Sequence, residues 1–222
     1  MTLLTFTEEN YLKAIYALQT NNASGEVSVN EIAERMKTKP ATVTDMMKKL
    51  SEKDLVVYER YKKLILSESG KLVALQIVRK HRLWETFLHQ MLHFSWDEVH
   101  EVAEELEHIH SQKLIDGLDK LLKYPQYDPH GDPIPNEKGI LPNASTMMLS
   151  NVVVGSACIL VGVKDTSSAF LKQLKKLNLD LGNEIKVLEE MPFDHSIVVL
   201  VDNENQLMLS EKIAANLLVR MN

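Results

Sequence analysis

The chain contains one cysteine, Cys158, among its 222 residues. A single thiol cannot form an intramolecular disulfide, and the lack of further thiolates argues against a closed structural zinc site. Cys158 lies in the apolar run 157–160. This position indicates a buried thiol with a structural role.

Long hydrophobic runs and a secretion signal are also missing. No apolar run approaches the roughly 18 residues that a membrane-spanning helix needs. The N-terminus lacks the positively charged segment and following apolar segment of a signal peptide. With 45% hydrophobic and 25% charged residues, the composition is that of an ordinary soluble chain, long enough for two or three domains. We therefore expect a cytoplasmic protein with no membrane partner.

Charge is distributed unevenly along the chain, whose formal net charge is −6. Residues 1–82 hold fourteen Lys and Arg against ten Asp and Glu, a net of +4. Residues 83–222 hold eleven against twenty-one, a net of −10. This asymmetry predicts an N-terminal part that binds a polyanion, joined to a part that handles cations.

Histidine and glutamate recur at one-turn intervals between residues 81 and 108. They lie in two segments of helical apolar spacing, His81 and Glu85 in the first and His100, Glu104, Glu107 and His108 in the second. At about 100° per residue, each set falls on one face of its helix. Carboxylates packed this closely repel one another unless a cation or hydrogen bonds offset them. The pattern therefore predicts a divalent metal site, and the alternative is an acidic helix face exposed to solvent.

The N-terminal part carries the pattern of a helix-turn-helix. Thr7, followed by two glutamates, is the predicted N-cap of a first helix. Ser28 and Glu31 predict a capping box for a short second helix, and a third helix is expected from Pro40 to Leu50. Two short helices joined by a tight turn are typical of DNA-binding units.

A β-hairpin with a basic tip is predicted next, from residues 55–58 and 64–66. Residues 37–63 contain eight basic and four acidic side chains, so helix and hairpin together indicate a winged helix. We expect the third helix to enter the major groove, with lysines on phosphates and shorter polar side chains near base edges. The alternative for each lysine is simple solvation of an exposed face. The predicted DNA-binding residues are Lys37, Lys39, Pro40, Thr42, Thr44, Asp45, Lys48, Lys49, Lys62 and Lys63.

Apolar side chains continue at helical spacing from the ligand segments to Leu121 and Leu122. This is more apolar surface than a small helical unit can bury alone, so we expect a homodimer interface. Residues 125–146 are rich in proline and glycine and predict an irregular linker. The remainder predicts a small β domain without a catalytic constellation, with one helix over 169–177 and strands at 152–154, 185–188, 196–201 and 206–209.

These motifs together resemble a known family. The framework His81-Arg82-Leu83-x-Glu85, followed by Val99-His100-x3-Glu104-x2-Glu107-His108, is similar to that of the diphtheria-toxin-repressor family of metal-dependent transcriptional regulators. The similarity is closest to its manganese-responsive branch, the manganese transport regulators. It implies a mainly α protein with a winged helix-turn-helix domain over 1–70 and a helical metal-binding and dimerisation domain over 71–124. After the linker, it implies an SH3-like (FeoA-like) domain over 147–222.

The resemblance implies a function as well. It implies a homodimer that represses transcription of metal-uptake genes by binding a pseudo-palindromic operator in double-stranded DNA. We therefore expect no enzymatic activity. In the family, a carboxylate at the position of Glu104 accompanies manganese-responsive members, and oxygen-rich ligand sets suit Mn(II). Mn(II) is therefore favoured and Fe(II) is possible, while Zn(II), Co(II) or Ni(II) could occupy the sites in vitro.

Two metal sites are implied by the resemblance. The primary set is Asn10, Glu104, Glu107 and His108, and the second set is His81, Glu85, His100, Asp128 and Asp165. Some members use ligands of the His81 type in a two-metal cluster, so the partition between the sites stays open. Asp128 precedes a proline and could equally initiate a turn.

The chain departs from the family pattern at Asn10, where members usually carry Asp or Met. An amide oxygen is an acceptable but neutral ligand. Either Asn10 serves, or Glu9 or Glu8 replaces it. His89, His93 and His110 lie off the predicted ligand face and receive no role.

Two other classes of function remain as alternatives. Glu105-x2-His108 matches one half of the motif of di-iron carboxylate enzymes, although that chemistry needs two such motifs on a four-helix bundle. A structural nucleoid protein would bind DNA regardless of metal. The His-Glu-x2-His helix of zinc hydrolases is missing from the sequence.

Overall fold

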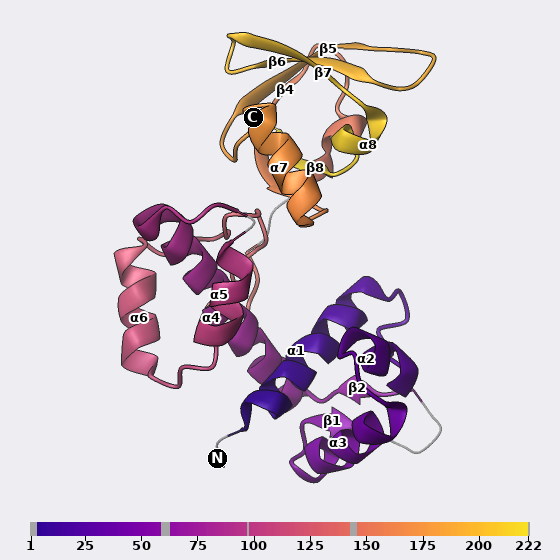
Figure 1. The fold of residues 1–222 in the computed structure, drawn as a ribbon, viewed down its shortest axis with the longest axis vertical. Coiled ribbons are helices and arrows are strands. Elements are labelled where there is room, and N and C mark those ends of the chain that lie inside the picture. The colour runs from indigo at the N-terminus through magenta and orange to yellow at the C-terminus, as the bar shows by residue number, and fades with distance from the viewer. Residues whose placement is uncertain (1–3, 59–62, 97, 143–145, 222) are drawn as a thin grey trace. The chain divides into compact units, whose positions relative to one another are not determined.

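The computed structural model describes residues 4–58, 63–96, 98–142 and 146–221 (Figure 1). Its helices are α1 (Phe6–Asn21), α2 (Val29–Arg35), α3 (Pro40–Glu52), α4 (Glu68–Leu92), α5 (Val99–Leu106), α6 (Gln112–Leu121), α7 (Ser168–Lys176) and α8 (Glu211–Ala214). Its strands are β1 (Val56–Val57), β2 (Ile65–Leu66), β3 (Met147–Met148), β4 (Ala157–Val163), β5 (Glu184–Glu190), β6 (Ile197–Val201), β7 (Asn205–Leu209) and β8 (Leu217–Met221), with a 3-10 turn, η1, at Leu149–Asn151.

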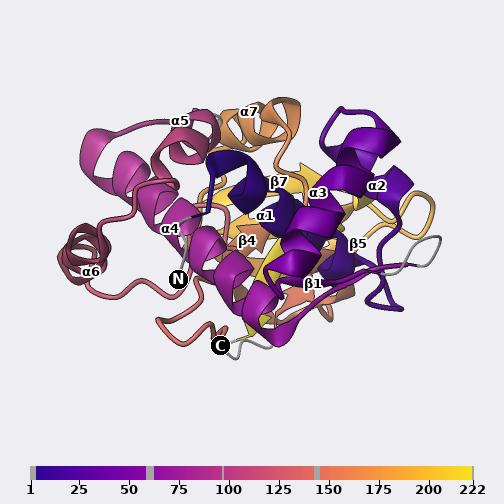
Figure 2. The ribbon, with the colours of Figure 1, turned by 90° about the horizontal axis from the view of Figure 1, so that it is seen from below.

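Contacts between residues divide the chain into two units, which are described separately. The first unit comprises Met1–His81, Glu104–Gln112 and Pro135–Ile140. The second unit comprises Arg82–Ala103, Lys113–Ile134 and Leu141–Asn222. The 25-residue helix α4 (Figure 2) and the helix α5 contribute to both units. The predicted domain boundaries are not decided by this division and stay predictions.

Helices α1, α2 and α3 of the first unit share one apolar core (Figure 1), in which Leu12, Ile32 and Met47 are fully buried. Ser28 and Glu31 form the predicted capping box of α2. The helix α1 begins two residues earlier than predicted, because its N-cap is Thr5 and not Thr7. The Thr5 side chain accepts a hydrogen bond from the Glu8 amide, and the Glu8 carboxylate accepts one from the Thr5 amide.

A short antiparallel ladder follows the helix-turn-helix. Val56 of β1 lies opposite Leu66 of β2, and this pairing confirms the base of the predicted hairpin. Gly70, in the first turn of α4, lies so close to this ladder that a Cβ would stand 1.8 Å from the Leu55 carbonyl oxygen. Glycine therefore lets α4 start directly against the wing. The tip of the hairpin, with Lys62, lies outside the described residues.

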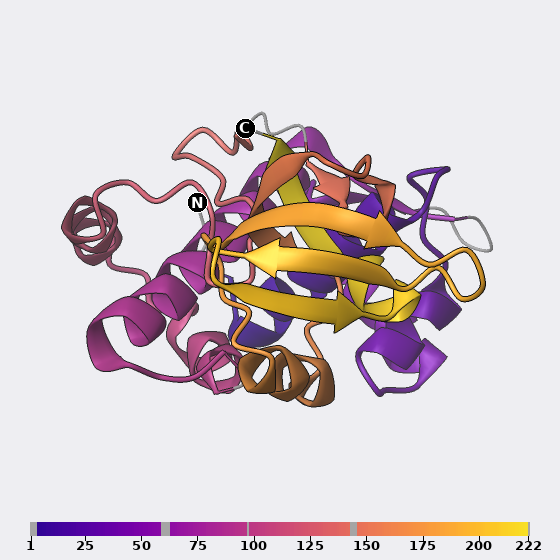
Figure 3. The ribbon, with the colours of Figure 1, turned by 90° about the horizontal axis from the view of Figure 1, so that it is seen from above.

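The C-terminal part of the second unit is a six-stranded antiparallel sheet in the order β3-β8-β4-β5-β6-β7. Figure 3 shows the strands side by side, with α7 next to them. The side chains of Leu171 and Leu174 on α7 are buried in the same core as Leu160 and Val199 of the sheet. The predicted mainly α fold with a small C-terminal β domain is therefore confirmed.

One predicted strand of this domain is wrong. Residues 152–154 lie between η1 and β4 and form no strand, and Val153 is 74% exposed. The sequence pattern does not predict β3, β4 or β8 either. In the sheet, β3 is an edge strand, and β8 and β4 are inner strands. Across the described helices, none is both long enough and apolar enough to cross a bilayer.

Candidate metal centres and DNA-binding surface

Side chains from α1, α4 and the end of α5 meet in the first unit. We call this cluster the first centre; its members are Glu9, Asn10, Lys13, Lys80, His81, Glu104, Glu107 and His108. The ends of α1 and α5 that supply them lie about a hundred residues apart in sequence, since the Glu9–His108 contact spans 99 residues. The structure therefore brings together Glu104, Glu107 and His108 of the predicted primary set and places His81 beside them. Asn10 follows Glu9, the partner of His108, on α1.

Glu107 is the most buried member of the first centre, with no exposed surface. Its Oε2 atom accepts a hydrogen bond from Lys13 Nζ at 2.5 Å and contacts His81 Nδ1 at 2.7 Å. Its Oε1 atom has no hydrogen-bond partner among the described residues. A buried carboxylate oxygen without a partner is costly. A cation at Oε1 would remove that cost.

His108 is oriented by two neighbours on α1. Its Nδ1 atom lies 2.6 Å from Glu9 Oε2, and its ring stacks on Phe6 with centroids 4.6 Å apart. A histidine held through Nδ1–H by a carboxylate presents the lone pair of Nε2 to a metal. Here, Nε2 faces the partnerless Glu107 Oε1 at 4.0 Å. Glu9 therefore acts as the residue that positions His108.

The geometry separates the three candidates for the α1 ligand. Glu8 is engaged in the α1 capping box and in an ion pair with Lys53 at 2.6 Å, and these contacts outweigh its burial and lower its carboxyl pKa. Glu9 pairs with His108. Asn10 Oδ1 is buried and has no hydrogen-bond partner among the described residues. The amide oxygen of Asn10 thus joins Glu107 Oε1 as a second buried acceptor that a cation would satisfy.

A second centre lies in the second unit and consists of Glu85, Asp128 and His130, all buried. One ligand atom of each lies within 4.8 Å of the others. Asp128 Oδ2 has no hydrogen-bond partner among the described residues, and Arg82 Nε approaches it only to 3.6 Å. His130 Nε2 lies 3.0 Å from the Trp96 carbonyl oxygen, so Nδ1 faces Glu85 at 3.7 Å. This set of two carboxylates and one imidazole fits a divalent cation.

The ionisable groups of the second centre shift one another's pKa values. Burial and the neighbouring carboxylates of Glu85 and Asp132 raise the pKa of Asp128 to about 7, although Arg82 and His130 oppose the shift. Burial alone would lower the pKa of His130, but the hydrogen bond with Glu85 and the charges of Glu85 and Asp128 raise it to about 9. A bound cation would take over the role of the His130 proton in offsetting these carboxylates.

The loop that carries Asp128 is tightly folded against β4. Asp128 Oδ1 accepts hydrogen bonds from the amides of His130 and Asp132, as expected for a turn-initiating aspartate. Gly131 has φ +85°, and a Cβ there would lie 2.0 Å from the Val161 carbonyl oxygen. The turn role and the ligand role of Asp128 are compatible, because the turn uses Oδ1 and leaves Oδ2.

The other predicted members of the second set are placed differently. His100 Nδ1 lies 3.2 Å from Glu85 Oε1, but its side chain is 61% exposed. Asp165 Oδ1 accepts a hydrogen bond from the Ser167 amide at 2.8 Å, and Asp165 is not among the three described residues that form the second centre. Glu105 is exposed, so the half-motif of the di-iron alternative does not face the first centre.

Three residues of these centres were missed from the sequence: Lys13, Lys80 and His130. Lys13 follows Asn10 by three positions on α1, a spacing that puts both on one helix face. His130 stands two residues after Asp128 in the loop that resembles the family. His110, to which no role was given, has Nδ1 3.7 Å from Glu9 Oε1 and lies at the edge of the first centre.

The outer face of α3 forms a candidate DNA-binding surface. Val43, Met47 and Leu50 bury the inner face. The exposed predicted residues are Lys37, Lys39, Pro40, Thr42, Asp45, Lys48, Lys49 and Lys63. Thr44 is half-buried, and its hydroxyl donates to the Pro40 carbonyl at 3.0 Å. Thr42 is therefore better placed than Thr44 to reach a base edge.

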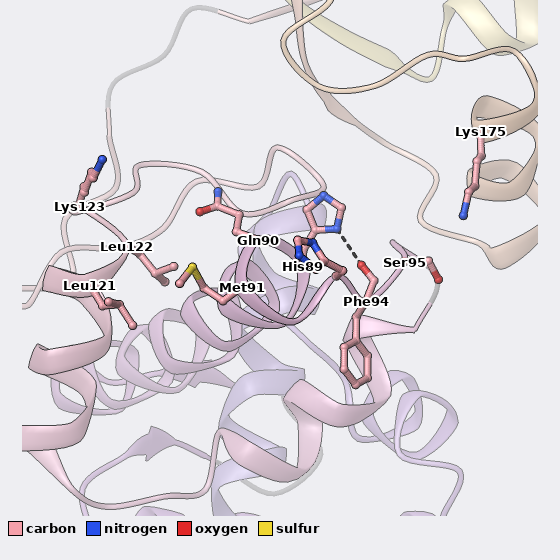
Figure 4. Close-up of a pocket in the computed structure, with 10 residues that line it drawn as sticks. His89, Gln90, Met91, Phe94, Ser95, Leu121, Leu122, Lys123 and Lys175 are labelled. Carbon is pink, nitrogen blue, oxygen red and sulfur yellow. Dashed lines mark hydrogen bonds between the residues drawn. The ribbon is translucent and has the colours of Figure 1, made fainter.

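A pocket of about 690 Å³ in the second unit does not resemble either centre (Figure 4). Its lining includes Met91, Leu121 and Leu122, and His89 Nδ1 lies 2.9 Å from the Phe94 carbonyl oxygen at one side. No carboxylate is found among the described residues that line it. The pocket therefore offers neither a cation site nor the paired carboxylates of a di-iron enzyme.

Models of known protein families match most of the chain. Three family models match: the N-terminal DNA-binding domain of iron-dependent repressors over residues 3–64, their metal-binding and dimerisation domain over 67–136, and the FeoA domain over 147–221. The iron-dependent repressor IdeR of Mycobacterium tuberculosis is 32% identical over 168 residues, which cover 72% of each chain. The transcriptional regulator MntR of Geobacillus kaustophilus is 33% identical over 120 residues, which cover 54% of this chain and 83% of MntR.

Solved structures agree with these matches. A manganese-dependent transcriptional repressor in complex with manganese is 33% identical, and the alignment covers 97% of this chain and 100% of that chain with a TM-score of 0.79. Both metals thus occur in the names of relatives: iron for IdeR and manganese for this repressor.

Proposed function

The chain belongs to the diphtheria-toxin-repressor family of metal-dependent transcriptional regulators, and from this premise we propose that it is a DNA-binding repressor activated by Mn(II) or Fe(II). The observation that carries the proposal is Glu107 Oε1, a buried oxygen that faces His108 Nε2 and has no hydrogen-bond partner in the described part of the chain. Asn10 Oδ1 on α1 is a second such oxygen. We propose that Asn10, Glu107 and His108, together with Glu104, hold the activating ion. The alternative function of a di-iron carboxylate enzyme is not supported, because the named relatives are repressors. Glu105, which its half-motif requires as a ligand, is also exposed.

The proposed ligands couple metal to DNA through α1. This helix shares its apolar core with α2 and α3, whereas Glu107 and His108 follow α5. Ligands from both segments would fix the distance between α5 and the recognition helix. A conformation that alone binds the ion is favoured by about 2.7 kcal/mol at a hundredfold excess over the dissociation constant. This energy is enough to raise the affinity for the operator by up to about a hundredfold.

The ligand chemistry favours Mn(II) over the metals that bind more tightly. Carboxylate and amide oxygens outnumber the single imidazole of the proposed site, and affinity alone would select Fe(II), Co(II) or Ni(II) over Mn(II). A sensor of Mn(II) must therefore respond to coordination geometry. Zn(II) is satisfied by four ligands and is expected to activate less well, because it need not recruit Asn10.

We propose a second ion at Glu85, Asp128 and His130. Asp128 Oδ2 is buried without a hydrogen-bond partner in the described part of the chain, and the raised pKa of Asp128 indicates a carboxylate that lacks compensation. His100 is the adjoining candidate, through its contact with Glu85. Asp165 remains a proposal that rests only on the family resemblance.

Repression would require a dimer. Several apolar side chains of the second unit are about half exposed: Met91, Leu92, Leu114 and Leu121. A second copy of the chain is the partner that the family's dimerisation domain implies. Two recognition helices related by a twofold axis would read a pseudo-palindromic operator, and genes of metal uptake are the proposed targets.

The test is metal-dependent DNA binding. Duplexes selected from a random pool with the protein and Mn(II) would be titrated at buffered free Mn(II), Fe(II) under anaerobic conditions, and Zn(II). We expect Mn(II) to activate at a free concentration no higher than that of Fe(II). DNA binding that ignores every metal would contradict the proposal and favour a structural nucleoid protein.

The metal preference is tested separately with Glu104→Cys. A sulfur ligand is expected to move the preference from Mn(II) toward Fe(II). An unchanged metal order in this variant would show that position 104 does not set the selectivity. The repressor function would stand in that case.

A further inference from the structure

Lys13 contacts two carboxylates and one imidazole of the first centre. Its Nζ atom lies 2.7 Å from Glu104 Oε1, 2.5 Å from Glu107 Oε2 and 3.2 Å from His81 Nδ1. The Lys13 side chain is 19% exposed and Glu107 is fully buried, so these contacts are largely shielded from water. An ammonium has three N–H donors and no acceptor. It therefore donates to two carboxylate oxygens, Glu104 Oε1 and Glu107 Oε2, that a divalent ion could also bind.

The hydrogen bonds divide the first centre into two halves. On one side, Glu107 Oε2 accepts from Lys13 and contacts His81. On the other side, Glu107 Oε1 and Asn10 Oδ1 have no hydrogen-bond partner among the described residues, and His108 Nε2 faces Glu107 Oε1. In the Glu107 carboxylate, Oε2 is thus paired with the ammonium group of Lys13, whereas Oε1 accepts no hydrogen bond from the described residues.

From this division we infer that Lys13 is a built-in cation that holds the His81 side of the first centre and limits it to one divalent ion. The inference rests on the proposed function, because it assumes that Asn10, Glu104, Glu107 and His108 bind that ion. Lys13 also orients the ligand, since its bond is to Oε2 and the other oxygen, Oε1, faces His108 Nε2 at 4.0 Å. It is a positioning residue for the metal and not a ligand.

The charges of the cluster support one ion. Glu9, Glu104 and Glu107 bring three carboxylates, while Lys13 and Lys80 bring two ammonium groups, and Lys80 Nζ lies 3.9 Å from Glu9 Oε1. One divalent ion then leaves a small net charge in the centre. Without Lys13, the carboxylates of Glu104 and Glu107 and the imidazole of His81 form a second ligand set of the kind that Mn(II) accepts.

The test counts metal ions. Parent protein and variants would be equilibrated with Mn(II), freed of excess by gel filtration in buffered Mn(II), and analysed for bound manganese per chain. Lys13→Met is expected to bind one Mn(II) more than the parent. Two Mn(II) ions that share Glu107 would couple magnetically, so the variant should also lose the six-line electron paramagnetic resonance spectrum of an isolated ion at the first centre. The second centre contributes equally to all samples.

Two matched variants control the count. Lys13→Arg keeps the charge and should bind the parental number of ions. Lys53→Met removes a lysine that pairs with Glu8, away from the first centre, and should also match the parent. If Lys13→Met is unstable without metal, Lys13→Gln, which keeps hydrogen-bond donors but no charge, is expected to show the same additional ion. Both variants can be refolded with Mn(II) before the count.

The outcomes separate the inference from the proposed function. If Lys13→Met and Lys13→Gln bind the same number of Mn(II) ions as the parent, whatever their affinity, Lys13 does not limit the number of ions and the inference is wrong. A parent that binds no Mn(II) would instead contradict the proposed function. An additional ion in the neutral variants alone would support the inference.

Discussion

Glu107→Gln is the perturbation that separates metal binding from folding most directly. The amide has nearly the shape of the carboxylate, so the fully buried site keeps its packing. It lacks the negative charge that holds a divalent ion at Oε1. We expect the variant to fold and to lose the stabilisation that Mn(II) gives the parent.

The size of the effect follows from mass action. At free Mn(II) of a hundred times the dissociation constant, binding to the native state stabilises the parent by about 2.7 kcal/mol. For a chain of this length, 1 kcal/mol shifts the melting temperature by about 2–4 °C, so the parent should gain about 5–11 °C. Glu107→Gln should gain less than about 2 °C from ions at the first centre.

The variant also changes the metal-free protein. Glu107 accepts a charge-assisted hydrogen bond from Lys13, and the loss of such a bond costs about 1.5–3 kcal/mol. Lys13 keeps its contact with Glu104 at 2.7 Å, so its charge does not become uncompensated and the cost should fall at the lower end. The metal-free melting temperature will therefore drop, and only the shift caused by Mn(II) is diagnostic.

The assay is thermal unfolding with and without Mn(II), followed by circular dichroism. Glu101→Gln is the control, because it makes the same chemical change at a residue that is exposed in the first turn of α5. The control should show the parental shift. A Glu107→Gln protein with the full parental shift would refute the assignment of Glu107 as a ligand.

Three further predictions concern DNA binding, the second centre and the thiol. Lys48→Ala and Lys49→Ala should each reduce the slope of log affinity against log salt by about 0.9 if each contacts one phosphate, as measured by fluorescence anisotropy; an unchanged slope would remove α3 from the interface. Gly131→Ala should lower the free energy of unfolding by about 1–3 kcal/mol, because φ is +85° and the added Cβ would meet the backbone of Val161. The control Gly117→Ala in α6, which has open space around it, should not lower it. Equal melting temperatures of the two variants would contradict this account. Burial raises the pKa of the Cys158 thiol to about 11. Iodoacetamide at pH 8 should therefore leave the thiol unmodified in the native protein and modify it in urea. Labelling of the native protein, detected by mass spectrometry, would refute this prediction.

Local chemistry explains what could be predicted from the sequence. The Ser28–Glu31 capping box and the spacing of Val43, Met47 and Leu50 define α2 and α3 without any distant contact. The one-turn spacing of His100 and Glu104 likewise predicts the face that they share on α5. The predicted helix is too long at its end, however, because α5 ends at Leu106 and Glu107 and His108 follow it in a turn. These signals depend on neighbours within one or two turns, which the sequence displays directly.

The C-terminal sheet shows where such signals fail. Residues 152–154 have the β-branched composition of a strand, but Gly155, with φ +90°, ends the run, and Val154 is half exposed. The strand β4 contains Gly162 and a change of register next to it, which weaken its pattern. Pairing with β8, about sixty residues further along the chain, is what makes β4 a central strand. A contact of that range has no local signature.

Lys13 shows a different limit, because its position was visible in the sequence and its role was not. It follows Asn10 by three residues on the first helix, a spacing that puts both side chains on one face. A search for metal ligands passes over lysine, since an ammonium has no lone pair to donate. The partners that give Lys13 its role, Glu104 and Glu107, lie 91 and 94 residues away. A basic residue on the ligand face of a helix can therefore indicate how many ions a carboxylate cluster holds, once the fold supplies those partners.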